Sequence, residues 1–182
     1  MPSIFDESDI LDVAPESLEA GSPLAFTVPD QEKSEWCWAA VGSGVRAFYE
    51  KQQLQRPCEI ANEFVGGDCC ANPDSCNVAQ SLAAVLKDMG YRTIPPKEQV
   101  EFDVIKSEID ADRPVCCFID FGTEIGHFVA LTAYDQDLRQ VGVIDPAPGE
   151  AHDDPRMIPF ASFRIDYNGG RWRETYLTQP RN

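Results

Sequence analysis

The sequence is poor in histidine, in positive charge and in long apolar runs, and each shortage narrows the possible functions. It contains only two histidines, His127 and His152, so any imidazole chemistry must use one of them. No apolar stretch reaches the roughly 20 residues that a membrane-spanning helix needs. The 15 Lys and Arg against 31 Asp and Glu give a formal net charge of −16, which repels nucleic acid and anionic membrane surfaces. We therefore expect no nucleic-acid partner and no membrane insertion.

The start of the chain also lacks positive charge. Residues 1–20 hold several Asp and Glu but no Lys or Arg, whereas a Sec signal peptide needs a basic start and an apolar core. We expect residues 1–22 to form an acidic, mobile leader, with a pro-segment or a secretion signal as an alternative role. Residues 23–182 are expected to form a single domain. The location stays open between the cytoplasm and export by a specialised secretion system.

The most informative feature that is present is a cysteine between two tryptophans, Trp36, Cys37 and Trp38, at the start of a helix-like run. The positive end of a helix dipole favours the thiolate, which is the nucleophilic form of cysteine. Gln31 stands six residues earlier, and its amide could donate to an oxyanion. A lone cysteine is usually a small buried hydrophobe. The combination with Gln31 favours a nucleophile.

A candidate base and its partner come from a predicted β-hairpin. His127 starts a β-branched and aromatic run that reaches Tyr134, and a second run ends at Asp145 before Pro146. Because strands joined by a short turn pair, His127 should lie near Asp145, as a general base beside a carboxylate that orients it. Asp145 could instead only begin an Asp-Pro turn. Asp135 is a competing carboxylate, but it lies at the opposite end of the hairpin.

Three motifs together resemble those of papain-like cysteine peptidases: residues 31–40 (QEKSEWCWAA), 126–131 (GHFVAL) and 143–146 (VIDP). The sequence is most similar to compact bacterial members, namely bacteriocin-processing peptidase domains and papain-like effector proteases of plant pathogens. The C-G-[SA]-C signature of plant papains is missing. The resemblance implies a peptide or protein substrate and no cofactor or metal. It also implies roles for four residues: nucleophile Cys37, base His127, orienting acid Asp145 and oxyanion donor Gln31.

The order of predicted elements, helices first and antiparallel strands second, indicates an α+β fold of papain-like type. We place a helical half at 30–113 and a sheet half at 114–182, with the cleft between them. Gly42 and Gly44 lower the stability of the first helix by about 1 kcal/mol each, so another backbone should approach them closely. Asn77 is the expected N-cap of the third helix. The expected helices are 37–49, 57–64, 78–89, 102–113 and 160–167, and the expected strands are 115–121, 127–134, 138–144 and 171–178.

The remaining cysteines leave the redox state open. Cys116 and Cys117 lie in an apolar predicted strand and should fill the core. The other four surround one loop, and three interpretations stay open for them. Free thiols suit a cytosolic protein, disulfides suit an exported one, and a zinc site would need four converging thiolates. These residues are Cys58, Cys69, Cys70 and Cys76.

The leading hypothesis is a monomeric cysteine peptidase that acts through a thioester acyl-enzyme. Two alternatives stay open. Transglutaminases and arylamine acetyltransferases share the order Cys, His, Asp and would pass the acyl group to an amine. The other alternative is a non-enzymatic metal-binding or interaction module organised by the cysteines of the 58–76 loop.

Overall fold

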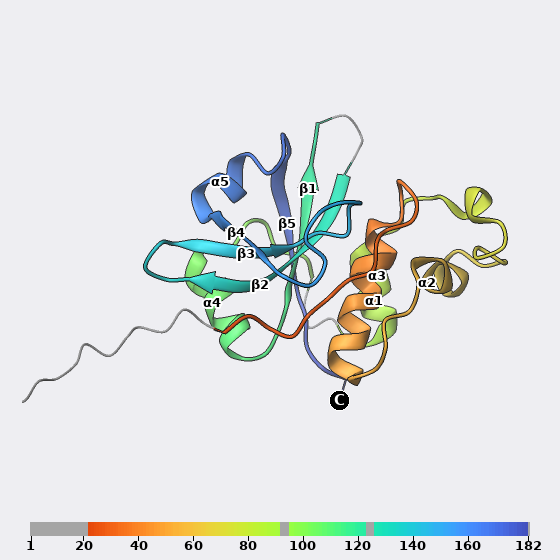
Figure 1. Ribbon diagram of the computed structural model, residues 1–182, viewed down its shortest axis with the longest axis horizontal. Coiled ribbons are helices and arrows are strands. Elements are labelled where there is room, and N and C mark those ends of the chain that lie inside the picture. The colour runs from red at the N-terminus through yellow and green to blue at the C-terminus, as the bar shows by residue number, and fades with distance from the viewer. Residues whose placement is uncertain (1–21, 92–94, 123–125, 182) are drawn as a thin grey trace, which may run out of the picture.

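The computed structural model describes residues 22–91, 95–122 and 126–181, so the expected leader lies outside it apart from residue 22. Three helices stand on one side of an antiparallel sheet, and the two parts lie next to each other (Figure 1). The predicted α+β class is confirmed. Among the described residues, no helix is both long enough and apolar enough to cross a membrane.

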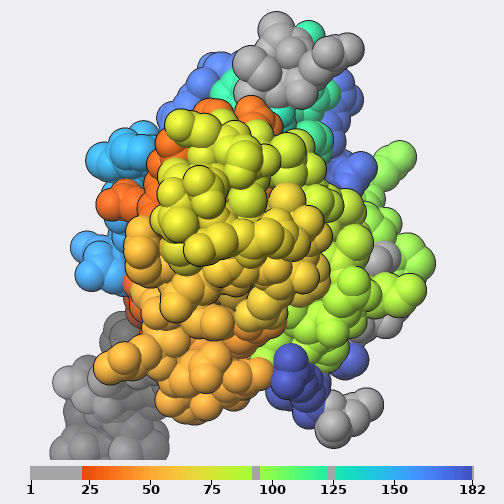
Figure 2. All heavy atoms as spheres, turned by 90° about the vertical axis from the view of Figure 1, so that its right-hand side faces the viewer, coloured from red at the N-terminus to blue at the C-terminus, as the bar shows by residue number. Residues whose placement is uncertain are grey.

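The helical side is built around α1, which runs from Cys37 to Glu50. Helix α2 (Pro57–Phe64) and helix α3 (Leu82–Met89) both pack against α1. A short 3₁₀ helix, η1 (Pro73–Cys76), lies in the loop between α2 and α3. Figure 2 looks straight at this side and shows α1, α2 and that loop forming one continuous surface. Helix α4 (Phe102–Asp110) packs instead on two strands of the sheet, β1 (Val115–Asp120) and β2 (Gly126–Asp135).

The sheet has five antiparallel strands in the order β4-β3-β2-β1-β5. The predicted hairpin is present, because β2 pairs directly with β3. Helix α5 (Phe160–Ile165) connects the edge strand β4 to the opposite edge, β5. The strands are β1 (Val115–Asp120), β2 (Gly126–Asp135), β3 (Gln140–Ile144), β4 (Arg156–Pro159) and β5 (Arg171–Leu177).

Several predicted bounds were wrong, and one strand was missed. Helix α4 ends at Asp110 rather than at 113, α5 ends at Ile165 rather than at 167, and β3 begins at Gln140 rather than at 138. The third helix begins at Leu82 rather than near Val78, and Ser81 is its N-cap, accepting from the N–H of Ala84 at 3.4 Å. Asn77 does not cap this helix because its side chain is used elsewhere, against the segment that precedes α1. Strand β4 was not predicted, since it is a short, mostly exposed edge strand that ends at Pro159. Edge strands are where proline is tolerated in sheets.

The lead-in segment 24–28 is extended and explains one of the two helix glycines. A Cβ atom on Gly44 would lie 2.6 Å from the carbonyl oxygen of Thr27, so this backbone does approach as predicted. Gly42 faces the side chain of Val85 instead, whose nearest atom would lie 3.4 Å from an added Cβ. The predicted backbone approach therefore holds for Gly44 and is wrong for Gly42.

This difference yields a matched pair of stability predictions. Gly44→Ala should destabilise the protein by about 1–3 kcal/mol, because a methyl group would press on a backbone oxygen that cannot turn aside. Gly42→Ala has room, so the gain in helix propensity should leave stability unchanged or raise it by up to about 1 kcal/mol. Urea unfolding of both variants measures this. Equal effects of the two substitutions would contradict the packing described here.

Candidate active site

The Cys37 thiol lies at the first residue of α1 and is 5% exposed. The N-cap residue, Trp36, makes no side-chain capping bond to the helix. The N–H of Cys37 is one of the first-turn donors that have no acceptor inside the helix. A helix terminus without a side-chain cap keeps its partial positive charge available to an anion beside it.

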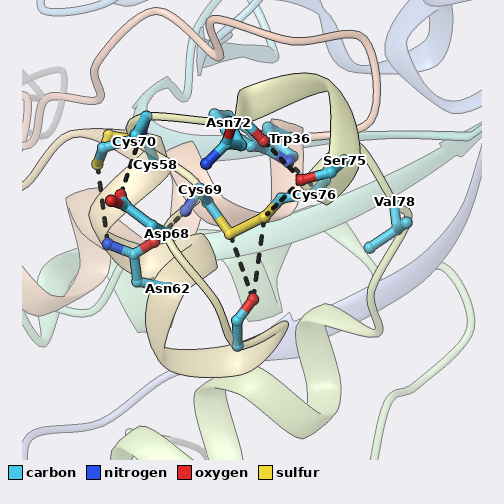
Figure 3. The surroundings of a disulfide bond; sticks show 12 residues. Trp36, Cys58, Asn62, Asp68, Cys69, Cys70, Asn72, Ser75, Cys76 and Val78 are labelled. Carbon is cyan, nitrogen blue, oxygen red and sulfur yellow. Dashed lines mark hydrogen bonds between the residues drawn. A yellow bond between two sulfur atoms is a disulfide. The ribbon is translucent and has the colours of Figure 1, made fainter.

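Two indoles hold this segment in place. The Nε1–H of Trp36 donates to the carbonyl of Cys76 at 2.7 Å, and the Nε1–H of Trp38 donates to the carbonyl of Val78 at 3.0 Å. The Oδ1 atom of Asn77 accepts at 3.0 Å from the backbone N–H that precedes Trp36. Figure 3 shows Trp36 beside Cys76. The tryptophans on either side of Cys37 thus fix the start of α1 to one loop, residues 76–78.

Cys76 belongs to the 58–76 region, which is cross-linked by two disulfides, Cys58–Cys70 and Cys69–Cys76 (Figure 3). The four sulfurs are used in pairs, so the disulfide interpretation holds and the free-thiol and zinc interpretations of this loop do not. A disulfide closing a short loop stabilises a fold by roughly 2–3 kcal/mol. Cys116 and Cys117 are free and buried in β1, as predicted. Burial raises the pKa of Cys116 to about 12 and also raises the pKa of Cys117 well above its ordinary value.

The hairpin brings His127 and Asp145 together. His127 is the second residue of β2, and Asp145 directly follows β3. The Nε2–H of His127 donates to Oδ1 of Asp145 at 2.6 Å. The Cys37 thiol interacts with the His127 side chain and raises its pKa. Because Asp145 occupies Nε2, Nδ1 is the ring nitrogen left for the sulfur. One imidazole therefore connects the start of α1 with the end of β3.

Asp145 is a buried carboxylate, 2% exposed, and it has donors besides His127. The backbone N–H of Ala147 donates to Oδ1 at 2.8 Å, and the phenol of Tyr167 donates to Oδ2 at 2.6 Å. The sequence analysis missed Tyr167. The only signal for it was general, namely that a buried carboxylate needs several donors. Tyr167 sits at the end of the predicted 160–167 helix, and no motif distinguishes it.

These contacts favour an imidazolium on His127 and a carboxylate on Asp145. Burial by itself lowers the pKa of His127, but the hydrogen bonds to Asp145 and Cys37 outweigh it and raise the pKa to about 9. Burial by itself raises the pKa of Asp145, but the bonds from His127, Tyr167 and Ala147 leave the pKa below its ordinary value. Each partner thus holds the other in its charged form near neutral pH.

Gln31 is close to the site but is not free. Its amide nitrogen donates to the carbonyls of Lys33 at 2.9 Å and Ser34 at 3.2 Å, which accounts for both of its N–H groups. The Oε1 atom is buried and has no hydrogen-bond partner among the residues that the structure describes. The Gln31 backbone N–H donates to the carbonyl of Pro146 at 2.9 Å, which joins this segment to the loop after Asp145. Gln31 therefore shapes its own loop in this state.

The second histidine, His152, and the competing carboxylate, Asp135, lie away from Cys37 and His127. His152 lies in the loop after Asp145, where its Nε2 atom is 3.2 Å from Oδ1 of Asp30. Asp135 is at the far end of β2, and its Oδ1 atom accepts from the N–H of Leu138 in the turn. Neither group contacts Cys37 or His127.

A cavity of about 510 Å³ borders the Gln31 segment. Its lining includes both signs of charge, Asp30 and Glu32 against Lys33 and Arg56, and Arg56 is paired with Glu32 at 3.0 Å. Because two acidic and two basic side chains line this cavity, the negative charge of the chain is not concentrated in it. A further cavity of about 580 Å³ lies between α4 and the β2–β3 turn, away from Cys37.

Comparisons with known proteins concern the family and the fold of the chain. A family model described as "Papain-like cysteine protease AvrRpt2" matches residues 22–167. Among solved structures, the peptidase domain of Streptococcus ComA superposes with a TM-score of 0.55 at 12% identity, covering 86% of this chain and 99% of that one. Xylellain, a cysteine protease from Xylella fastidiosa, gives a TM-score of 0.49 at 15% identity, covering 100% of this chain and 95% of that one. No curated protein sequence matches significantly.

The charged state of His127 yields a direct test. In an NMR titration the His127 ring protons should titrate with a midpoint of about 9, so the imidazolium persists above neutral pH and is lost as the pH rises further. Asp145→Ala should move the midpoint down, because the carboxylate that stabilises the cation is gone. Asp135→Ala, at the other end of β2, is the matched control and should not move it.

A His152→Ala variant, which leaves a single imidazole, assigns the signals. A wild-type midpoint near the ordinary value of 6.5 would contradict the pairing.

Proposed function

Since the chain belongs to the family of papain-like cysteine proteases described by AvrRpt2, we propose that it cleaves peptide bonds with a triad of Cys37, His127 and Asp145. The protein is a cysteine protease and acts on peptide or protein substrates, as its family does. This excludes a purely non-enzymatic module. The proposal concerns which residues carry the reaction and how they share it.

One observation carries the proposal. The His127 imidazole has Asp145 on one nitrogen at 2.6 Å and Cys37 on the other side, and its raised pKa favours the cation. A thiolate beside that cation at a helix N-terminus is stabilised and remains nucleophilic. No metal or organic cofactor is required for this chemistry.

Acylation proceeds by attack of the Cys37 thiolate on the carbonyl carbon of the scissile peptide. A carbon–sulfur bond forms, and the carbonyl electron pair moves to oxygen. The resulting oxyanion then collapses and the carbon–nitrogen bond breaks. The leaving amine takes the proton from the His127 imidazolium, so the products are a thioester, a free amine and a neutral imidazole.

Deacylation reverses the roles. The neutral His127 accepts a proton from water, whose oxygen attacks the thioester carbon. Collapse of this second oxyanion breaks the carbon–sulfur bond and releases a carboxylic acid and the thiolate. His127 keeps the proton, so the ion pair with Cys37 is restored. Asp145 holds the ring with Nε2–H bound and Nδ1 aimed at the sulfur throughout.

The oxyanion is proposed to bind the backbone N–H of Cys37 and the side chain of Gln31. For Gln31 this requires that one amide N–H leave its loop carbonyl when substrate arrives. The bond to Ser34, at 3.2 Å, is the longer of the two and is the one we expect to exchange. The net gain arises because a hydrogen bond to an anion is stronger than one to a carbonyl.

The triad is tested by ranking four variants in a peptide-library cleavage assay. Cys37→Ala and His127→Ala should abolish detectable turnover, because they remove the nucleophile and the proton donor to the leaving amine. Asp145→Ala should retain measurable activity, since the carboxylate only orients the ring. His152→Ala is the matched control and should behave as wild type.

Circular dichroism confirms that each variant is folded. An inactive His152→Ala protein beside an active His127→Ala protein would remove the basis of the assignment.

The role of Gln31 is tested separately. Gln31→Ala should lower kcat by about 10²–10³, the usual effect of losing one oxyanion donor, with little change in KM. Lys33→Ala serves as the control in the same segment, because it keeps the backbone carbonyl to which Gln31 donates and loses only an exposed ion pair with Asp74. Near-normal turnover of Gln31→Ala would make Gln31 a residue that only shapes its loop.

A further inference from the structure

The phenol of Tyr167 is the one side-chain donor to Oδ2 of Asp145 within the part of the chain that the structure describes. The other carboxylate oxygen, Oδ1, is taken by His127 and by the N–H of Ala147. Tyr167 is 2% exposed and its ring packs against Phe163, with centroids 5.4 Å apart. The phenol and the carboxylate are therefore both out of contact with bulk water.

The backbone around Tyr167 is well suited to hold this donor still. Tyr167 and Gly170 exchange both backbone hydrogen bonds, at 2.7 and 2.9 Å, and so close a tight turn between α5 and β5. Asn168 and Gly169 take the positive φ values that such a turn needs. Because the turn opens directly into the sheet, the phenol oxygen is anchored to the same sheet that carries His127.

We propose that Tyr167 is a positioning residue of the protease, which fixes the rotation of the Asp145 carboxylate and through it the orientation of His127. The inference rests on the proposed triad. Tyr167 contacts neither the sulfur nor the substrate carbonyl in this scheme, and acts only through Asp145.

The phenol of Tyr167 satisfies an anionic oxygen of Asp145 that is buried in the protein. Without the phenol, Oδ2 of Asp145 would be a buried anionic oxygen with no side-chain donor among the described residues, which is strongly unfavourable in a protein interior. The carboxylate would turn about its χ2 bond to share its remaining donors. Any such rotation of the carboxylate misaligns the hydrogen bond that Nε2 of His127 donates to Asp145, which is 2.6 Å long in the structure. The ring would then present its second nitrogen less accurately to Cys37.

Charged groups near Tyr167 and Asp145 shift the pKa of the phenol in opposite directions. Burial raises the pKa of Tyr167, and the neighbouring Asp145 raises it further, so the phenol keeps its proton. Arg156, from β4, stands over the Tyr167 ring, with its guanidinium carbon 5.5 Å from the ring centroid, and its positive charge opposes that rise in pKa. Glu150, at 3.5 Å, partly neutralises Arg156. Cys37 and His127 complete the set on the other side of Asp145.

The test substitution is Tyr167→Phe, which keeps the ring and removes only the hydroxyl. We expect kcat to fall about tenfold, the effect of losing one hydrogen bond to a charged group, while KM stays within about twofold. Tyr134→Phe is the matched control. Its phenol also donates to a carboxylate, Asp110, at 2.6 Å, but at the far end of β2. Tyr134→Phe should leave both constants unchanged.

A second measurement separates positioning from a general structural effect. In the Asp145→Ala background, adding Tyr167→Phe should produce no further loss of kcat, because the group through which Tyr167 acts is absent. A further tenfold loss in that background would overturn the proposal. An unchanged kcat for the single variant would overturn it as well.

Proton NMR measures the hydrogen bond between His127 and Asp145 directly. The hydrogen-bonded Nε2–H of His127 should give a low-field resonance in the wild type, and Tyr167→Phe should shift it upfield or broaden it as the carboxylate turns. A downfield shift would overturn the proposal, since it would mean that Tyr167 withdraws charge from Asp145 rather than orienting it. The proposed function fails separately, through full activity of Cys37→Ala.

Discussion

The burial of one carboxylate, Asp145, constrains much of the sheet side of this protein. An anion with 2% exposure is unstable in a fold unless donors surround it, and here three converge on it from different elements. His127 comes from β2, Ala147 from the loop that follows β3, and Tyr167 from the turn before β5. The hairpin register, the path of that loop and the connection from α5 to β5 must all fit this requirement together.

The other side of the site has a different constraint, because a helix terminus left without a side-chain cap has to be held by something else. Trp36 and Trp38 provide this by donating to the 76–78 loop, and the two disulfides of the 58–76 region stiffen that loop in turn. The segment before Cys37 is joined to the sheet side through the bond from Gln31 to Pro146. The proposed nucleophile is thus positioned by contacts from both sides of the molecule.

Whether a part of this site can be predicted from the sequence depends on how far apart in the chain the interacting residues are. Helix α2 and the β2–β3 hairpin follow from local periodicity and turn residues, and the hairpin was enough to pair His127 with Asp145. Asn77 is a good cap by local rules, yet it bonds to the segment before Trp36, which is distant in sequence. Tyr167 likewise bonds to a residue distant in sequence, Asp145, whereas the amide of Gln31 is engaged by the carbonyls of Lys33 and Ser34 in its own loop. Each of these depends on backbone atoms or partners whose approach no periodicity encodes.

The seven cysteines fall into two groups, four in disulfides and three free and buried, so one chain can hold both disulfides and a reactive thiol. Four are paired in the 58–76 region, and disulfides persist in oxidising compartments but are rare in the cytosol, which favours the exported alternative. In such a compartment a free thiol must avoid oxidation or exchange. Cys116 and Cys117 do so because burial raises their pKa, so that almost no thiolate forms. Cys37 has to react as a nucleophile in the proposed chemistry, so restricted access is what protects it, and it is 5% exposed. Burial of the sulfur at the start of α1, which Trp36 and Trp38 hold to the 76–78 loop, is therefore as much a part of the proposed chemistry as the ion pair with His127.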